Sequence, residues 1–293
     1  MSAKTSSSCS AVALLCCIGL TGCFGTPTPL APGLGGSVGL PHHGVLTGAV
    51  ELPQRGEGYA RYRQVSPHYW GNPRLVRAIE TAASAVMRER PGGAPLLVGD
   101  LSARGGGKIS GHNSHRTGRD VDLLWYVTTP AGAPVQSPGF VRVGPDGLAR
   151  VDGAEEERFL ALDVERQWLL FKKLLTTEGV GVQFFFVSRD VEALLVEYAL
   201  SRGEQLELVW HAQTVMLQPA DSAAHDDHVH MRIACTAEEA ATGCEGGGPH
   251  WEWLPPRPAL GPLDARSLAD IARDDPFLLE PVAASGAASG GGA

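Results

Sequence analysis

The spacing of apolar residues along the chain predicts three helices. In residues 75–86, apolar side chains recur every three or four positions, which is typical of a helix with one buried face. The segment 164–175 has a mixed helical spacing and precedes Gly179, a residue type that commonly ends helices. A third helix is predicted to begin after Ser188, a favoured N-cap residue, and to end at Gly203.

Short apolar runs predict strands between and after these helices. Residues 96–98, 121–127 and 180–187 are runs of strand length, and in 228–231 two histidines alternate with Val and Met. The helices and strands together predict an α+β fold in which a small antiparallel sheet is flanked by helices. The 37 glycines and 21 prolines indicate a loop-rich chain, and 129–153 is expected to be a surface loop or small hairpin at a substrate groove.

The first 23 residues have the pattern of a secretory signal. Lys4 precedes an apolar run, 11–20, that is too short to span a bilayer, which needs roughly 20 apolar residues. The run ends in Leu20-Thr21-Gly22-Cys23, which resembles the bacterial lipobox, in which the cysteine is acylated. Phe24, not Asp, follows the cysteine. By the same resemblance, this favours a periplasmic protein whose lipid anchor lies in the outer membrane.

Composition divides the rest of the chain into three parts. Residues 24–44 are rich in Pro and Gly and are expected to form a tether. A single domain is expected over 45–260, because 293 residues are near the upper limit for one hydrophobic core. The tail, 261–293, is expected to be largely disordered, with a short helix near Leu268 and Ile271.

Charge and cysteine content narrow the possible partners and compartment. The net charge of −8 and the absence of a basic patch argue against binding to nucleic acid, and no pattern indicates an oligomeric state. Cys235 and Cys244 are the two cysteines outside the leader. They are close enough to form a disulfide in an oxidising compartment, although two unrelated thiols are the alternative.

Two short segments, 111–122 and 225–230, hold five of the ten histidines together with four aspartates. A catalytic zinc site has about three protein ligands and one open position for water. The sequence therefore predicts a zinc site formed by His115, Asp122 and His230. The five histidines outside these two segments are expected to have no special role, namely His42, His43, His68, His211 and His250.

The spacing within each segment suggests further roles. Gly118 lies where a tight turn between His115 and Asp122 needs a permissive residue. Asp120 shares a strand face with Asp122 and is expected to orient a ligand from behind. His228 shares a face with His230, beside the metal, and is the predicted general base for hydrolysis of an acyl bond without a covalent intermediate.

The pattern Gly-His-x-Ser-His-x-x-Gly-x-Asp-x-Asp at 111–122, with His-x-x-His-x-His at 225–230, resembles the penicillin-insensitive murein endopeptidases. These are zinc peptidases related to the lysostaphin-type enzymes, and the resemblance extends from about residue 44 to 235. It implies cleavage of D-alanyl to diaminopimelyl cross-links in peptidoglycan, without an acylable serine for β-lactams. It also implies the ligands and base named above. His112 and His225 match histidines that distinguish this family, which makes His112 a further metal candidate and His225 a further catalytic candidate.

The resemblance is not complete, and two other functions are alternatives. Val45 stands where the family has a cysteine, and Asp146-Gly147-Leu148-Ala149 lacks a histidine that the family has there. One alternative is a zinc D-alanyl-D-alanine carboxypeptidase, against which His112 and His225 argue. The other is a cell-wall-binding lipoprotein without catalysis, which would have no need for an intact set of ligands and base.

Overall fold

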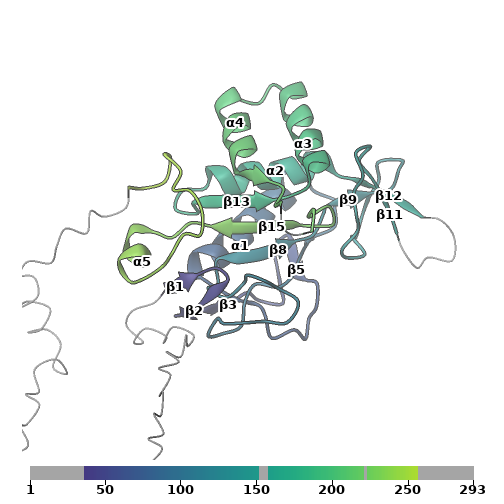
Figure 1. Ribbon diagram of the computed structural model, residues 1–293. Coiled ribbons are helices and arrows are strands. Elements are labelled where there is room, and N and C mark those ends of the chain that lie inside the picture. The colour runs from purple at the N-terminus through teal and green to yellow at the C-terminus, as the bar shows by residue number, and fades with distance from the viewer. Residues whose placement is uncertain (1–35, 152–157, 221–222, 257–293) are drawn as a thin grey trace, which may run out of the picture.

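The computed structural model describes residues 36–151, 158–220 and 223–256 (Figure 1). The predicted signal, Cys23, most of the tether, the 261–293 tail and its helix near Leu268 lie outside the described residues. Within the described ranges, no helix has the length and apolarity needed to cross a membrane.

The fold is built on a mixed sheet of seven strands, which confirms the predicted α+β class. The sheet is larger than expected and is not purely antiparallel, because two of its strand pairs, β13 with β14 and β5 with β7, run parallel. In spatial order its strands are β14 (Met216–Leu217), β13 (Val182–Phe186), β15 (Val229–Ile233), β8 (Asp120–Leu123), β7 (Leu96–Val98), β5 (Tyr59–Arg61) and β4 (Arg55–Gly56).

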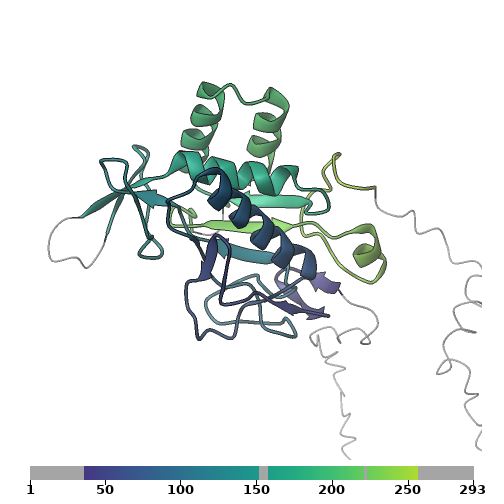
Figure 2. The same ribbon diagram turned by 180° about the vertical axis from the view of Figure 1, so that it is seen from behind.

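Helices cover one face of this sheet. Figure 2 shows α1 (Pro73–Glu89) lying across the back of the sheet with α2 (Val164–Thr176) beside it. Asn72 caps α1 by accepting a hydrogen bond from the backbone N–H of Arg74, and the apolar stripe of α1 is buried. In the described part of the chain no helix lies over the opposite face (Figure 1), so side chains there are available to form a site.

The three predicted helices are present, and two further helices were not predicted. Ser188 caps α3 (Arg189–Ser201) as expected, by accepting from the N–H of Val191. The missed helices are α4 (Leu206–Val215) and α5 (Ala237–Ala241). The apolar pattern of α4 is misleading because Leu206 is 51% and Trp210 61% exposed. In α5 the overlooked signal is a capping box between Thr236 and Glu239.

The predicted strand over 121–127 is interrupted. β8 ends at Leu123, and β9 (Val127–Thr128) belongs to a separate four-stranded sheet. The buried Trp125 occupies the break and donates a hydrogen bond from Nε1 to the carbonyl of Asp226. The second sheet takes two short strands from the segment 129–153 that was expected as loop or hairpin, namely β10 (Pro134–Val135) and β11 (Leu148–Arg150), and its remaining strand is β12 (Phe159–Leu162).

Regular structure begins before Val45, the expected start of the domain. Strand β1 (Gly36–Leu40) pairs antiparallel with β2 (His43–Thr47), so part of the expected tether is folded. Its side chains reach the body of the domain: Ser37 donates a hydrogen bond to the carbonyl of Thr117. A further small pair is formed by β3 (Val50–Glu51) and β6 (Trp70–Gly71).

A disulfide joins Cys235 and Cys244, with their Cα atoms 6.0 Å apart. It closes the segment that follows β15 and contains α5. The buried guanidinium of Arg119 donates to the carbonyls of Ile233 and Glu245 on the two sides of this bridge. The end of β15 is therefore fixed by a covalent link and by two hydrogen bonds.

Candidate metal centre

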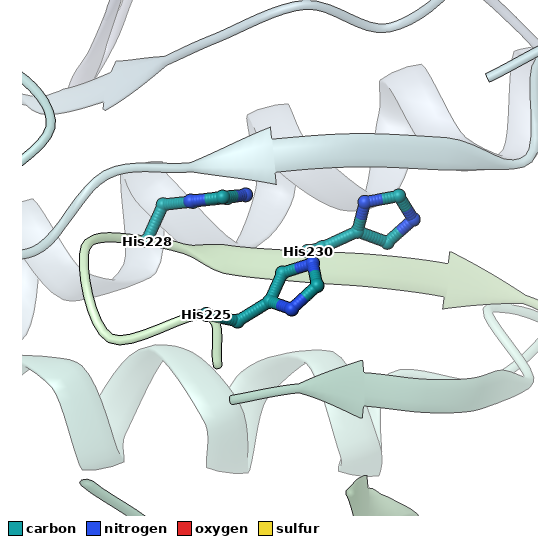
Figure 3. Close-up of side chains that lie close together, drawn as sticks. All are labelled: His225, His228 and His230. Carbon is teal, nitrogen blue, oxygen red and sulfur yellow. The ribbon is translucent and has the colours of Figure 1, made fainter. Parts of the chain in front are cut away.

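The pairing of β15 with β8 brings the two histidine-rich segments together. The strands are antiparallel, with His230 opposite Asp122 and Arg232 opposite Asp120. Residues opposite each other point to the same face of a sheet, so all four side chains share the face that lacks a helix. Figure 3 shows His225 and His228 reaching from the loop before β15 toward His230 on the strand.

Three donor atoms form a nearly equilateral triangle. His115 Nε2 lies 3.2 Å from Asp122 Oδ1 and 3.2 Å from His230 Nδ1, and His230 Nδ1 lies 3.3 Å from Asp122 Oδ1. A tetrahedral zinc ion with bonds of about 2.0–2.1 Å needs ligand atoms roughly 3.3–3.4 Å apart. The spacing of these atoms therefore fits a tetrahedral metal ion.

The hydrogen bonds of the two histidines turn their lone pairs toward this triangle. His115 Nδ1 donates to the carbonyl of Leu101 at 2.6 Å, and His230 Nε2 donates to Asp120 Oδ1 at 2.9 Å. When both rings are neutral, these bonds leave His115 Nε2 and His230 Nδ1 as acceptors that face each other, an arrangement that a cation would stabilise. Asp122 Oδ1 is buried and receives no hydrogen bond from any described residue, as expected of a metal ligand.

Both aspartates are charged at neutral pH although they are buried. Burial would raise the pKa of Asp122, but His115, His228 and His230 hold that pKa well below the ordinary value. Burial opposes ionisation of Asp120 in the same way, and Arg232 and His230 lower its pKa instead. The site therefore presents the Asp122 carboxylate as a candidate metal ligand and the Asp120 carboxylate behind His230.

The backbone between His115 and Asp122, the two candidate ligands of the first segment, is bent, as predicted. Gly118 has φ of 69°, and a side chain there would overlap Leu46 and come within 2.9 Å of the backbone nitrogen of Asn72. His115 also has a positive φ, of 63°, which is uncommon for a residue other than glycine. The local strain at His115 is maintained by burial and by its hydrogen bond to Leu101.

His228 lies beside the triangle, on the same side as His230. Its Nε2 is 3.4 Å from Asp122 Oδ1, and its Nδ1 contacts Asp227 Oδ1 at 2.6 Å. Burial disfavours the charged ring, but the negative charges of Asp122 and Asp227 and the hydrogen bond to Asp227 outweigh it and raise the pKa of His228 to about 9. A cation held by Asp122 would remove part of that attraction.

His112 lies on the other side of Asp122. Its Nδ1 is 3.7 Å from Asp122 Oδ2, and its Nε2 is 3.3 Å from Asp100 Oδ2. Asp100 accepts a hydrogen bond from Ser66 and lies 3.8 Å from His68 Nδ1. His68 was expected to have no special role, but it contacts the carboxylate that contacts His112.

His225 completes the cluster from the loop before β15. Its φ is 54°, and its Nδ1 donates to the carbonyl of Ala223 at 2.8 Å. Burial, followed by repulsion from His230 and His228, lowers the pKa of His225 to about 4, so its ring is neutral. Its ring centre is 5.1 Å from that of His228.

These groups open into a pocket of about 630 Å³. Aromatic rings form much of its wall, and His42, another histidine expected to be without a role, also lines it. Phe140, from the segment 129–153 expected at a substrate groove, packs edge-on against His228 with ring centres 5.1 Å apart. Several lining residues were not identified from the sequence, namely Tyr62, Asp100, Phe186, Asp227 and Arg232.

Some of the pocket residues that were not identified could have been found from a local sequence signal, and others could not. Asp227 is inside the second histidine segment, and Asp100 follows a predicted strand closely, so both had a local signal. Arg232 and Phe186 had none, because their place in the pocket results from pairing among β8, β15 and β13.

Comparison with known proteins agrees with the geometry. A family model described as penicillin-insensitive murein endopeptidase matches residues 37–138, which include His112, His115 and Asp122. A penicillin-insensitive murein endopeptidase of Haemophilus influenzae is 27% identical over 277 residues, covering 87% of this chain and 85% of that protein.

Shorter matches have higher identity. Proteins with the same name from Escherichia coli (strain K12 / DH10B) and Shigella boydii serotype 18 are 37% identical over 98 residues. These matches cover 33% of this chain and 35% of each relative. The Haemophilus match, by contrast, is long enough to include both histidine segments. Over most of its length the chain is similar to the penicillin-insensitive murein endopeptidase of Haemophilus influenzae, and over residues 37–138 it matches the family model of that description.

Proposed function

We propose that this protein is a zinc endopeptidase that hydrolyses D-alanyl to diaminopimelyl cross-links in peptidoglycan. The observation that carries the proposal is the triangle of His115 Nε2, Asp122 Oδ1 and His230 Nδ1, with sides of 3.2–3.3 Å. The names of the relatives supply the substrate, murein, and the insensitivity to penicillin. Hydrolysis by water forms no acyl-enzyme, so a β-lactam has no nucleophile to block.

In this proposal His115, Asp122 and His230 hold the zinc ion. Two imidazoles and one carboxylate are ligands that zinc accepts, and they leave one position open. When bound, zinc would polarise the scissile carbonyl and lower the pKa of a water molecule. Asp120 fixes the ring of His230 by accepting its Nε2 proton at 2.9 Å.

His228 is the proposed general base. It takes the proton of the attacking water and returns it to the amine released when the C–N bond breaks. Its Nε2 is on the side of Asp122, and its Nδ1 is held at 2.6 Å by Asp227, so the ring is oriented before substrate binds. Phe140 packs against the same ring and restricts its movement.

The two remaining histidines have supporting roles in the proposal. His112 contacts the metal region through Asp122 Oδ2 and is oriented by Asp100. His225 contributes to catalysis together with His228, which its neutral ring and its position 5.1 Å from that ring support.

We also propose that the enzyme acts in the periplasm as a lipid-anchored protein. Its substrate is the cell wall, and the bridge between Cys235 and Cys244 is typical of an oxidising compartment. The signal would be removed by cleavage just before Cys23, the acylated Cys23 would anchor the mature protein in the outer membrane, and 45–260 would form the peptidase domain.

The test uses the protein without its first 23 residues and purified cross-linked muropeptide dimers. Conversion of dimers to monomers is expected, with loss of activity in a zinc chelator and recovery when zinc is added back. Benzylpenicillin should leave the rate unchanged. Release of free D-alanine alone would instead indicate a carboxypeptidase, and no reaction with zinc present would contradict the proposal.

A further inference from the structure

Arg232 is held rigidly at the edge of the metal site. It follows His230 by two positions on β15, so the two side chains share a face and both line the pocket. Its Nε donates to Asp120 Oδ1 at 2.6 Å, and its guanidinium carbon lies 5.3 Å from the ring centre of Phe186. The residue is 9% exposed, which leaves the guanidinium little freedom.

The guanidinium nevertheless has unused hydrogen-bonding capacity. An arginine side chain carries five N–H donors in a planar fork. Only the Nε donor is used, because no described residue accepts a hydrogen bond from either Nη atom of Arg232. A confined cation with two free Nη groups on a pocket wall is suited to binding a planar anion such as a carboxylate.

The position of Arg232 relative to the metal ligands suggests which carboxylate it binds. Asp120 Oδ1 contacts both Arg232 Nε and His230 Nε2, so Arg232 is separated from the metal triangle by the His230 ring. In the proposed substrate, the diaminopimelyl carbon that carries the scissile nitrogen also carries a free carboxylate. With the scissile carbonyl at the metal, that carboxylate lies only a few bonds away.

We propose that Arg232 binds this carboxylate and selects substrates that have it. The inference rests on the proposed function and specifies how the substrate is oriented. Arg63 also lines the pocket, but it is exposed, and its guanidinium carbon lies 5.9 Å from the ring centre of Tyr62, with no hydrogen-bond acceptor for the guanidinium among the described residues. On other sides the carboxylates of Asp100 and Asp227 would repel an anion.

The experiment compares two muropeptide dimers that differ only at this group, one with the free carboxylate and one with the carboxamide. The wild-type enzyme should cleave the acid with a kcat/KM about 10- to 100-fold higher, as expected for loss of a charge-assisted hydrogen bond. Arg232→Gln should remove this preference, and Arg232→Lys should retain a weaker one. Arg63→Gln is the matched control and should keep the wild-type ratio.

For each variant, the ratio of kcat/KM for the acid to kcat/KM for the carboxamide tells whether Arg232 recognises the substrate carboxylate or only holds Asp120 in place. Loss of support would slow both substrates equally and leave the ratio unchanged, which would overturn the proposal. Equal cleavage by the wild type, or loss of preference in Arg63→Gln, would also overturn it. Calorimetry on metal-depleted protein gives the dissociation constants of both dimers, and their ratio tests the same preference without turnover. If neither dimer is cleaved, the proposed function fails, while the binding ratio still decides the role of Arg232.

Discussion

His230 and Asp122 lie directly opposite each other on β15 and β8, with His230 Nδ1 3.3 Å from Asp122 Oδ1. This register places one residue from each histidine-rich segment at the same point of the sheet. His115 reaches both atoms from the turn before β8. The candidate metal site is thus held by hydrogen bonds between two central strands.

Removing a donor atom from the triangle should remove the metal. Asp122→Asn keeps the shape of the side chain but replaces the charged ligand with a weak neutral one. We expect stoichiometric zinc in the wild type and a loss of activity of at least about 100-fold in the variant. Metal analysis after dialysis, with His43→Ala as an exposed control outside the pocket, provides the measurement. Full zinc content in Asp122→Asn would contradict the assigned ligand set.

Asp120 should affect zinc affinity more than the chemical step. Asp120→Asn leaves His230 with a neutral partner, so the ring is a weaker ligand and is less firmly oriented. Zinc affinity should fall about 10- to 100-fold, as measured by competition with a chromophoric chelator. At saturating zinc the variant should recover most of its activity. An unchanged zinc affinity would mean that Asp120 holds Arg232 in place but does not strengthen His230 as a ligand.

His228 and His230 should separate catalysis from binding of the metal. His228→Ala should keep zinc and lose about 10²- to 10⁴-fold in kcat, because the proton acceptor is gone. His230→Ala should lose both zinc and activity. Zinc content and kcat measured on the same preparations distinguish the two effects. Full activity in His228→Ala would show that another group accepts the proton.

Gly118 should be among the glycines least tolerant of a side chain. In Gly118→Ala, the positive φ costs about 1–2 kcal/mol, and overlap with Leu46 adds roughly 1–3 kcal/mol. Gly92 is the matched control, because it has a φ of 80° but nothing within 4 Å of an added Cβ. Urea unfolding should show a loss for Gly118→Ala that exceeds that of Gly92→Ala by at least about 1 kcal/mol.

The bridge between Cys235 and Cys244 should stabilise the fold without taking part in catalysis. A loop with a sequence separation of 9 should contribute about 2–3 kcal/mol through the entropy of the unfolded chain. The double variant Cys235→Ser, Cys244→Ser should therefore have a lower Tm. At a temperature where it remains folded, its kcat should be close to that of the wild type. Loss of activity without loss of stability would imply a direct role near the pocket.

Much of this protein was predictable from local patterns. The buried stripe of α1 and the Ser188 cap of α3 depend on neighbouring residues, so the sequence itself carries their signal. The density of histidine and aspartate in 111–122 and 225–230 is equally local, and it led to the prediction of a metal site, while the roles assigned to single residues stay predictions. Where burial departed from the apolar pattern, as for Trp210 in α4, local inference failed.

The sequence by itself determined which chemistry is present: two imidazoles and a carboxylate of the kind that holds zinc, with a further histidine beside them. The tertiary structure decided which groups surround them. Asp100, Phe186 and Arg232 entered the site through strand pairing and loop packing between distant segments. A strand's alternation shows which residues share its face, but not which strand lies beside it. That choice depends on burial across the whole sheet, and it placed Arg232 beside the candidate metal ligands.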